Sequence, residues 1–235
     1  MVGCCGAVRL LLDDVPGATL VSGTAWQRWY DMDDYRVFKA DVSQRVMRDV
    51  CTGYQDGSSA LNPDGTLRWE QKRQPAVDID DVGGDVGDDL AWHPRARPAA
   101  VTMCRARRID VWADGTALHV DAFFQDSSTL PEGGRQSIHE YTLTARADLE
   151  TGTLRAVHPV PRVLPYGECP LAVKHVGALA GLPLRDLRGA VIERLRGRLG
   201  CTHLNDMLRA LADVPVLARQ LTAVVGTQRH CGGTT

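Results

Sequence analysis

The chain has 235 residues, an apolar share of 44% and a net charge of −2. This length fits one large domain or two small ones, and the near-neutral charge gives no reason to expect a nucleic acid or an anionic membrane as partner. No apolar run is long enough to span a bilayer, and the N-terminal leucine run ends too early, at Asp13, for a signal peptide. The seven cysteines form no CxxC pair, so we expect a cytoplasmic chain with reduced thiols.

The first part of the chain, residues 1–97, is expected to be an N-terminal extension. Residues 1–25 predict one or two short strands, broken at a Pro-Gly step. Residues 41–51 predict a short helix, and the acidic, glycine-rich stretch 78–89 predicts an exposed loop or linker. An aromatic group predicts a hydrophobic patch, for which ordinary core packing is the simpler interpretation: Trp26, Trp29, Tyr30 and Tyr35.

The second part, residues 98–235, predicts a β-meander followed by helices. Four β-rich runs cover residues 101–111, 117–124, 138–147 and 154–160. An Asp-Gly step joins the first two runs and predicts a tight hairpin, and a Thr-Gly step lies between the last two. A helical stripe follows over 184–199, and another helix begins near Thr202. We therefore expect an α+β fold, in which an antiparallel β-meander packs against C-terminal helices.

A thiol, an imidazole and a carboxylate gather at the start of that last helix, in the Gly-Cys-Thr-His-Leu segment at 200–204 and at Asp206. Thr202 is a suitable N-cap residue, which would place Cys201 just outside the helix N-terminus. There the helix macrodipole favours a thiolate. His203 and Asp206 are three residues apart and therefore share a helix face. The pattern predicts a reactive or metal-binding group.

Other motifs precede this segment in a fixed order. An Asp-Gly turn is followed by an acidic strand at 120–126, by His139 at the start of the next strand, by a Pro-Tyr-x-x-Cys element ending at Cys169, and by a Gly-Leu step. Together with the terminal signature, the series over residues 105–221 resembles a bacterial family of uncharacterised proteins marked by GCTHL. That family more often carries glutamate where this chain has Asp121. The resemblance implies a fold and a site, and leaves the reaction open.

The polar residues of these motifs come from separate elements, as active-site residues often do. We expect Cys201 and His203 to converge in one pocket with at least one of Asp121, Asp126 or His139. Asp121 and Asp126 are five apart on one strand and so point to opposite faces. Three arginines of the preceding strand, over 101–111, are expected on the exterior of that strand: Arg105, Arg107 and Arg108. The candidate catalytic residues are Cys201, His203, Asp206, His139, Asp126 and Asp121.

Three interpretations of these residues remain open. Cys201 and His203 form a nucleophile and its base if their side chains face each other. A divalent metal such as zinc would find soft and borderline ligands in Cys169, Cys201, His203 and His139. Otherwise the thiols are small buried apolar groups, and His203 satisfies a backbone carbonyl. The chain lacks GxGxxG, P-loop and HExxH motifs, so no organic cofactor is expected.

The leading function is thus a small-molecule enzyme without an organic cofactor, a hydrolase or a lyase. The alternative is a noncatalytic binding or assembly protein, in which the GCTHL segment is only a structural helix start. A polar pocket between sheet and helices would favour the enzyme, whereas a flat exposed apolar face would favour assembly. A small-molecule substrate is expected and a homo-oligomer stays possible, with neither nucleic acid nor membrane as partner.

Overall fold

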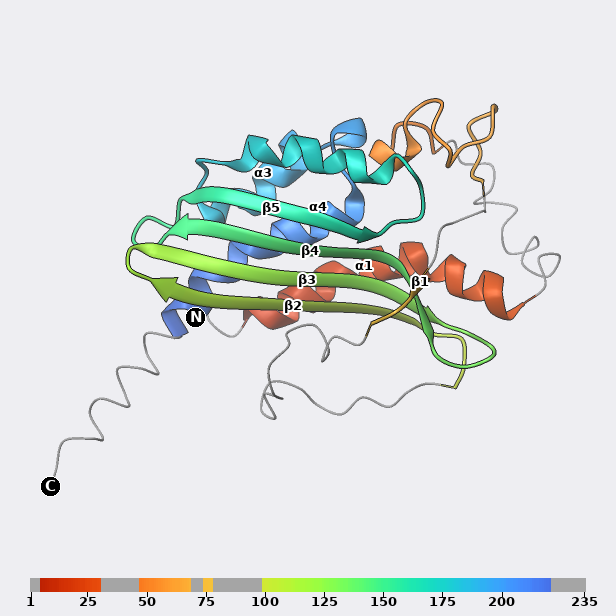
Figure 1. The fold of residues 1–235 in the computed structure, drawn as a ribbon, viewed down its shortest axis with the longest axis horizontal. Coiled ribbons are helices and arrows are strands. Elements are labelled where there is room, and N and C mark those ends of the chain that lie inside the picture. The colour runs from red at the N-terminus through yellow and green to blue at the C-terminus, as the bar shows by residue number, and fades with distance from the viewer. Residues whose placement is uncertain (1–4, 31–46, 69–73, 78–98, 221–235) are drawn as a thin grey trace, which may run out of the picture.

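The structure is a computed structural model and describes residues 5–30, 47–68, 74–77 and 99–220. An antiparallel sheet carries helices against one of its faces (Figure 1). The helices and strands are α1 (Cys5–Trp29), η1 (Thr52–Tyr54), β1 (Gln74–Pro75), β2 (Met103–Asp114), β3 (Ala117–Thr129), β4 (Arg135–Asp148), β5 (Leu154–Val163), η3 (Cys169–Leu179), η4 (Leu184–Asp186), α3 (Leu187–Arg194), η5 (Gly197–Leu199), α4 (Thr202–Ala210) and η6 (Leu211–Asp213). The α+β fold predicted from the sequence is confirmed.

The sheet is a meander of four long strands, in the order β2-β3-β4-β5. The short β1 pairs with the beginning of β4, on the same edge that β5 occupies further along. Both predicted hairpins are present, and each turn contains a glycine in the left-handed region, Gly115 at φ 57° and Gly152 at φ 66°. A side chain disfavours this backbone conformation, which explains why glycine stands at both turns.

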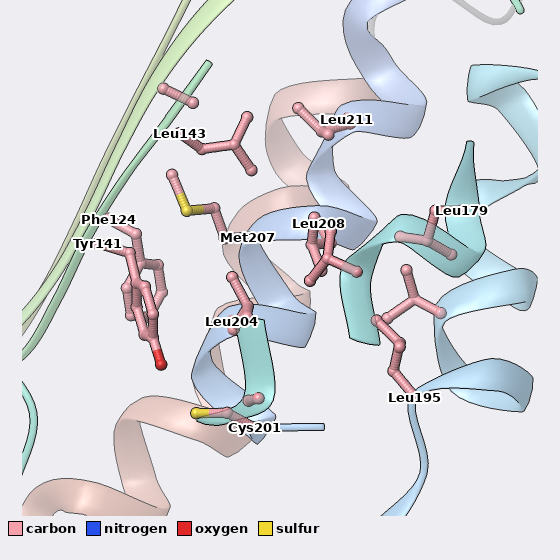
Figure 2. Close-up of a cluster of buried hydrophobic side chains, with 14 of the residues drawn as sticks. Phe124, Tyr141, Leu143, Leu179, Leu195, Cys201, Leu204, Met207, Leu208 and Leu211 are labelled. Atoms are coloured by element: carbon pink, nitrogen blue, oxygen red, sulfur yellow. The ribbon is translucent and has the colours of Figure 1, made fainter. Parts of the chain in front are cut away.

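The main core lies between the sheet and the C-terminal helices. Alternate residues of β3 and β4 face it, among them Phe124, Tyr141 and Leu143. Figure 2 shows these three side chains facing Leu204 and Met207 of α4. The other side of α4 packs against η3 and α3 through leucines that are fully buried. This packing fixes α4 across one face of the sheet, with its first turn above the ends of β3 and β4 that carry polar residues.

The N-terminal prediction was wrong, because residues 5–29 form one helix, α1, with Pro16 inside it. The helix packs against β2, β3 and α4. Its inward side chains include Asp13 and Asp14, and its outward ones include Leu11 and Leu12. This arrangement, reversed in the first half of α1, obscured the helix, because the apolar side chains of a surface helix usually mark its buried face.

Other local predictions also need correction. Residues 47–51 are turn and bend, not helix, while 41–46, Tyr35 and the acidic stretch 78–89 lie outside the described residues. The helix expected over 184–199 is divided into η4, α3 and η5. The helix α3 ends at Arg194, because Leu195 leaves helical geometry at φ −114° and ψ 43°, and Gly197 then adopts a φ of 53° that no α-helix contains. In the aromatic group, Trp26 stacks on Tyr30 with both rings partly exposed, and Trp29 donates a hydrogen bond to the Thr129 carbonyl.

The start of α4 differs by one residue from the expected one. Cys201 is the N-cap, with an extended backbone at φ −121° and ψ 129°, and Thr202 is the first helical residue. The Asn205 amide donates to the Cys201 carbonyl. The Asn205 side chain also donates to the Leu195 carbonyl at 2.9 Å, and this bond ties the helix start to the end of α3.

Candidate functional site

The core face of the sheet changes from apolar to polar along the strands. In neighbouring rows across β2, β3 and β4, Ile109, Ala122 and Leu143 are aligned at the apolar end. Two residues further along each strand, Arg107 aligns with Phe124 and Tyr141. The residues of the last row are all polar: Arg105, Asp126 and His139. Because period-two alternation sets the face of each side chain, this whole row points toward the helices.

Asp126 lies between two imidazoles. Its Oδ2 is 3.5 Å from Nδ1 of His139 and 3.6 Å from Nε2 of His203, which reaches down from the first turn of α4. The two rings stack, with their centroids 3.4 Å apart and their planes at 15°. Among the described residues, neither of these two ring nitrogens has a hydrogen-bond partner. The three residues, all buried, bring one ligand atom each within 4.8 Å of one another.

Arg105 holds the other side of the Asp126 carboxylate. Its Nε and Nη2 donate to Oδ1 and Oδ2 of Asp126 at 2.7 and 2.9 Å, which is the two-point geometry that orients a carboxylate best. Its Nη1 donates to Asp206 Oδ2 at 2.8 Å, one turn beyond His203 on α4. The guanidinium lies 4.8 Å from the centre of the Phe124 ring. Arg105 therefore links β3 to α4 and fixes the position of Asp126.

The electrostatics of the group follow from its burial. Burial alone would raise the pKa of Asp126, but the approach of His139, the bonds from Arg105 and the nearby His203 hold that pKa well below its usual range. Burial, with the charge of His139, lowers the pKa of His203 well below 6.5 despite the opposing pull of Asp126. Near neutral pH, Asp126 is thus an ionised carboxylate and His203 a neutral imidazole.

Cys201 lies on the far side of His203 from Asp126. Its Sγ is 3.8 Å from Nδ1 of His203, while Nε2 of the same ring faces Asp126. The thiolate expected for Cys201 is not favoured, although the amides at the helix start do act in the expected direction. Burial raises the pKa of Cys201 by more than the amides of Leu204 and His203 and the hydroxyl of Tyr141 lower it. Figure 2 shows Cys201 beside the apolar core, below Leu204 and near the hydroxyl end of Tyr141.

The remaining candidate residues are divided between the two faces of the sheet. Asp121 is exposed on the opposite face, across from Asp110, and takes no part in the group. Cys169 is buried at the start of η3, against Gly53, and is not among the three clustered residues. Asp206 joins the group through Arg105, and burial raises its pKa against the influence of the nearby arginines.

Sequence reasoning missed the arginines. Arg105 and Arg107 were expected on the strand exterior, but their side chains are only 3% and 10% exposed. The available signal was alternation, because both share the strand face of Ile109 and Val111. Arg108, on the other face, is partly exposed beside Asp110 as expected. Asp14 of α1 was also missed; it pairs with Arg107 and approaches Arg105.

The fold and the site together define the class of protein. It is a domain of one antiparallel sheet and packed helices, with a buried carboxylate between two imidazoles. Residues 103–217 match a protein family described as "Protein of unknown function (DUF2889)". The match runs from β2 to just beyond η6, so the matched segment contains the arginines, Asp126 and both histidines. No curated protein and no solved structure matches the chain. Among the helices of the described residues, none is both long and apolar enough to cross a bilayer.

Proposed function

We propose that this protein is a small-molecule enzyme, a hydrolase or a lyase, in which Asp126, His139 and His203 hold a catalytic divalent metal ion. One observation carries the proposal: two buried imidazole nitrogens both face the same carboxylate oxygen, and neither has a hydrogen-bond partner in the part of the chain that the structure describes. Buried polar atoms in native proteins are rarely left unpaired. A cation would satisfy both nitrogens, and two histidines with one carboxylate form a recurrent set of metal ligands.

The spacing of these atoms supports a small ion. Ligands about 2.1 Å from a tetrahedral zinc lie roughly 3.4 Å from one another, close to the separations of 3.5 and 3.6 Å at Asp126. Arg105 does not exclude the ion, because a carboxylate oxygen has two lone pairs. The stacked rings would have to turn so that their lone pairs converge. On the other side of His203, Nδ1 faces Thr202 Oγ1 at 3.3 Å, the kind of contact that orients a ligating imidazole.

Three protein ligands leave a coordination position for water or substrate, as catalytic zinc sites do. Such an ion would polarise a substrate carbonyl or activate a bound water. Buried, ionised Asp126 would supply the negative charge that keeps the ion in place. The unbridged thiols of Cys51, Cys169 and Cys201 support a reducing compartment, so we further propose the cytoplasm as the location.

The experiment is metal analysis of the purified full-length chain, followed by loading with Co²⁺. The proposal predicts close to one ion per chain and the visible absorption of four-coordinate cobalt. His203→Gln and His139→Gln should lose both, while His158→Gln, an exposed histidine on β5, should retain them. On a panel of small hydrolase and lyase substrates, only the metal-loaded protein should show catalytic turnover. Absence of metal binding, or equal binding by His203→Gln, would overturn the proposal.

A second candidate, an assembly protein, is favoured by the outward face of α1. Val8, Leu11, Leu12 and Val15 on this face are 58–69% exposed, and contiguous apolar side chains of this kind often mark an interface. The occupant would be a second copy of the chain, packed helix against helix. Light scattering separates the two candidates, because Leu11→Glu should convert a dimer to a monomer if assembly is the function, while metal content should not change.

A further inference from the structure

The first half of α1 binds the rest of the protein through charges. Arg9 pairs with Asp213, Asp13 with Arg188, and Asp14 with Arg107. The leucines of the same turns point outward. Since a surface helix usually buries its apolar stripe, contacts of this half with the domain depend on electrostatic pairing.

Asp14 sits where the two buried arginines meet. Its Oδ1 accepts a hydrogen bond from Arg107 Nη2 and lies 3.5 Å from Arg105 Nη1. One turn further along, a Cβ added to Gly17 would come within 2.2 Å of the same Arg105 nitrogen. The backbone of α1 therefore lies directly on the guanidinium of Arg105. A side chain at residue 17 would have to displace that guanidinium.

Asp14 is the anion that faces Arg107 at this position. Arg105 is already neutralised by Asp126 and Asp206. Arg107 donates to the backbone carbonyl of Asp206 at 2.9 Å, and its Nε has no hydrogen-bond partner in the described segments. Within the described residues, Asp14 is the carboxylate that Arg107 contacts. Because a buried guanidinium without a counter-ion is strongly unfavourable, removal of Asp14 would leave a vacant anion site.

We propose that Arg107, with Arg105 beside it, recognises a carboxylate group of the substrate, and that Asp14 occupies the place of that carboxylate in this structure. The proposal rests on the function proposed above, since it names the substrate class of the same site. Arg107 is one row of the sheet away from the Asp126–His139 row. A carboxylate bound there would place the rest of a small substrate beside the two imidazoles.

The division of residues along the chain fits this arrangement. Arg105, Arg107, Asp126, His139 and His203 all lie in the family-matched segment 103–217, whereas Asp14 belongs to α1, outside it. Substrate and Asp14 would compete for the same guanidinium, so binding requires that Asp14 withdraw. Asp206, which accepts a hydrogen bond from Arg105, lines a cleft of about 280 Å³ together with Arg209.

The test is the binding of propionate, with propionamide as the uncharged probe, measured calorimetrically on metal-free protein. Asp14→Ala should bind propionate about tenfold more tightly than the wild-type chain, since one competing charge-assisted bond is lost. Asp14→Asn, which keeps the side-chain volume, should show the same gain. The matched control is Asp13→Ala, which removes the adjacent carboxylate that pairs with Arg188, and it should bind as the wild type does.

Adding Arg107→Met to Asp14→Ala should abolish the gain, and propionamide should bind none of the proteins. Equal propionate affinity in the wild type and both Asp14 variants would overturn the proposal. An equal gain in Asp13→Ala would also overturn it, because general loosening of α1 would then be the cause. The propionate measurements use metal-free protein, so their failure is distinct from a failure of metal binding. If the protein binds no metal, carboxylate recognition by Arg107 is still tested independently.

Discussion

At the scale of single residues, the site depends on an ionised carboxylate that is completely buried. Asp126 remains charged because Arg105 contacts both of its oxygens. Removing one partner of a buried ion pair leaves the other uncompensated, at a cost of about 3–5 kcal/mol. The neutral state of His203 results from the same burial. Each protonation state is thus set by neighbours from other elements.

The lowered pKa of His203 predicts a loss of stability in mild acid. Below pH 6.5 the unfolded chain takes up a proton at this residue, while the native state does not until a lower pH. The free energy of unfolding should therefore decrease as pH falls through this window, by at most about 1.4 kcal/mol per pH unit. Urea unfolding of wild type and His203→Gln at several pH values measures it.

The variant should have a flatter profile between pH 6.5 and the native pKa of His203. Asp206, whose raised pKa acts in the opposite sense, is common to both proteins and cancels in the difference. Asp126 adds a loss of stability only below pH 3.8. Identical profiles for the two proteins would contradict a neutral His203, and His158→Gln, an exposed histidine, provides the control.

For Cys201 we predict an inert thiol. Burial raises its pKa above 9.0, so less than about 1% is thiolate at pH 7. Iodoacetamide should label it much more slowly in the native state than in denaturant, and more slowly than the half-buried Cys104. Cys201→Ser should destabilise the fold by about 1–3 kcal/mol without loss of metal. Rapid native labelling would instead restore Cys201 as a nucleophile.

At the scale of elements, the start of α4 depends on a close approach at Gly200. The backbone there is extended, at φ −139°, so conformation alone does not require glycine. A Cβ at this position would lie 2.1 Å from the Leu195 carbonyl oxygen. The Gly200 carbonyl in turn accepts hydrogen bonds from the amide and hydroxyl of Thr52. The first residue of the GCTHL segment thus joins α3, α4 and η1.

Gly200→Ala should destabilise the protein by about 1–3 kcal/mol, because the added methyl group overpacks this junction. Gly189→Ala is the matched control, since its Cβ would meet nothing within 4 Å and it lies inside α3. It should stabilise the protein by about 0.5–1 kcal/mol, as alanine does in helices. Thermal unfolding of both variants measures the contrast. An unchanged stability of Gly200→Ala would show that the junction can accommodate the added methyl group.

At the scale of the whole molecule, segments before residue 98 contribute to the same core as the family-matched part. Ala60 and Leu61 belong to the main hydrophobic cluster, and the Tyr166 hydroxyl donates to the Arg68 carbonyl at 2.8 Å. Charges on α1 neutralise Arg107 and Arg188. The N-terminal extension that the sequence suggested is therefore packed against the domain in the described parts of the chain.

Residues 99–220 expressed alone should consequently be less stable than the full chain. Loss of the buried contacts and exposure of unpaired arginines should lower the melting temperature by about 10 °C or more. Calorimetry on the two proteins at equal concentration measures the difference. An unchanged melting temperature would mean that α1 and residues 47–68 contribute no stability, and the family-matched part would then be independent.

The sequence by itself determined the four long strands, their turns and, to within one residue, the start of α4. Period-two alternation and the Asp-Gly step predict β2 and β3, and the same alternation places Asp126 and Asp121 on opposite faces. The GCTHL segment also pointed to His203. These features are local, because each depends on residues a few positions apart, and local spacing is what a sequence displays directly.

Only the tertiary structure decided which charges meet. Asp14, Arg105, Asp126 and Asp206 come from α1, β2, β3 and α4, and no local pattern states that they share one network. The strand register set Arg105 opposite Asp126, and the packing of α4 brought His203 onto His139. Burial then fixed the protonation states, turning the expected thiolate of Cys201 into a thiol. Desolvation and long-range pairing depend on the three-dimensional neighbourhood of a group, which spacing along the chain does not contain.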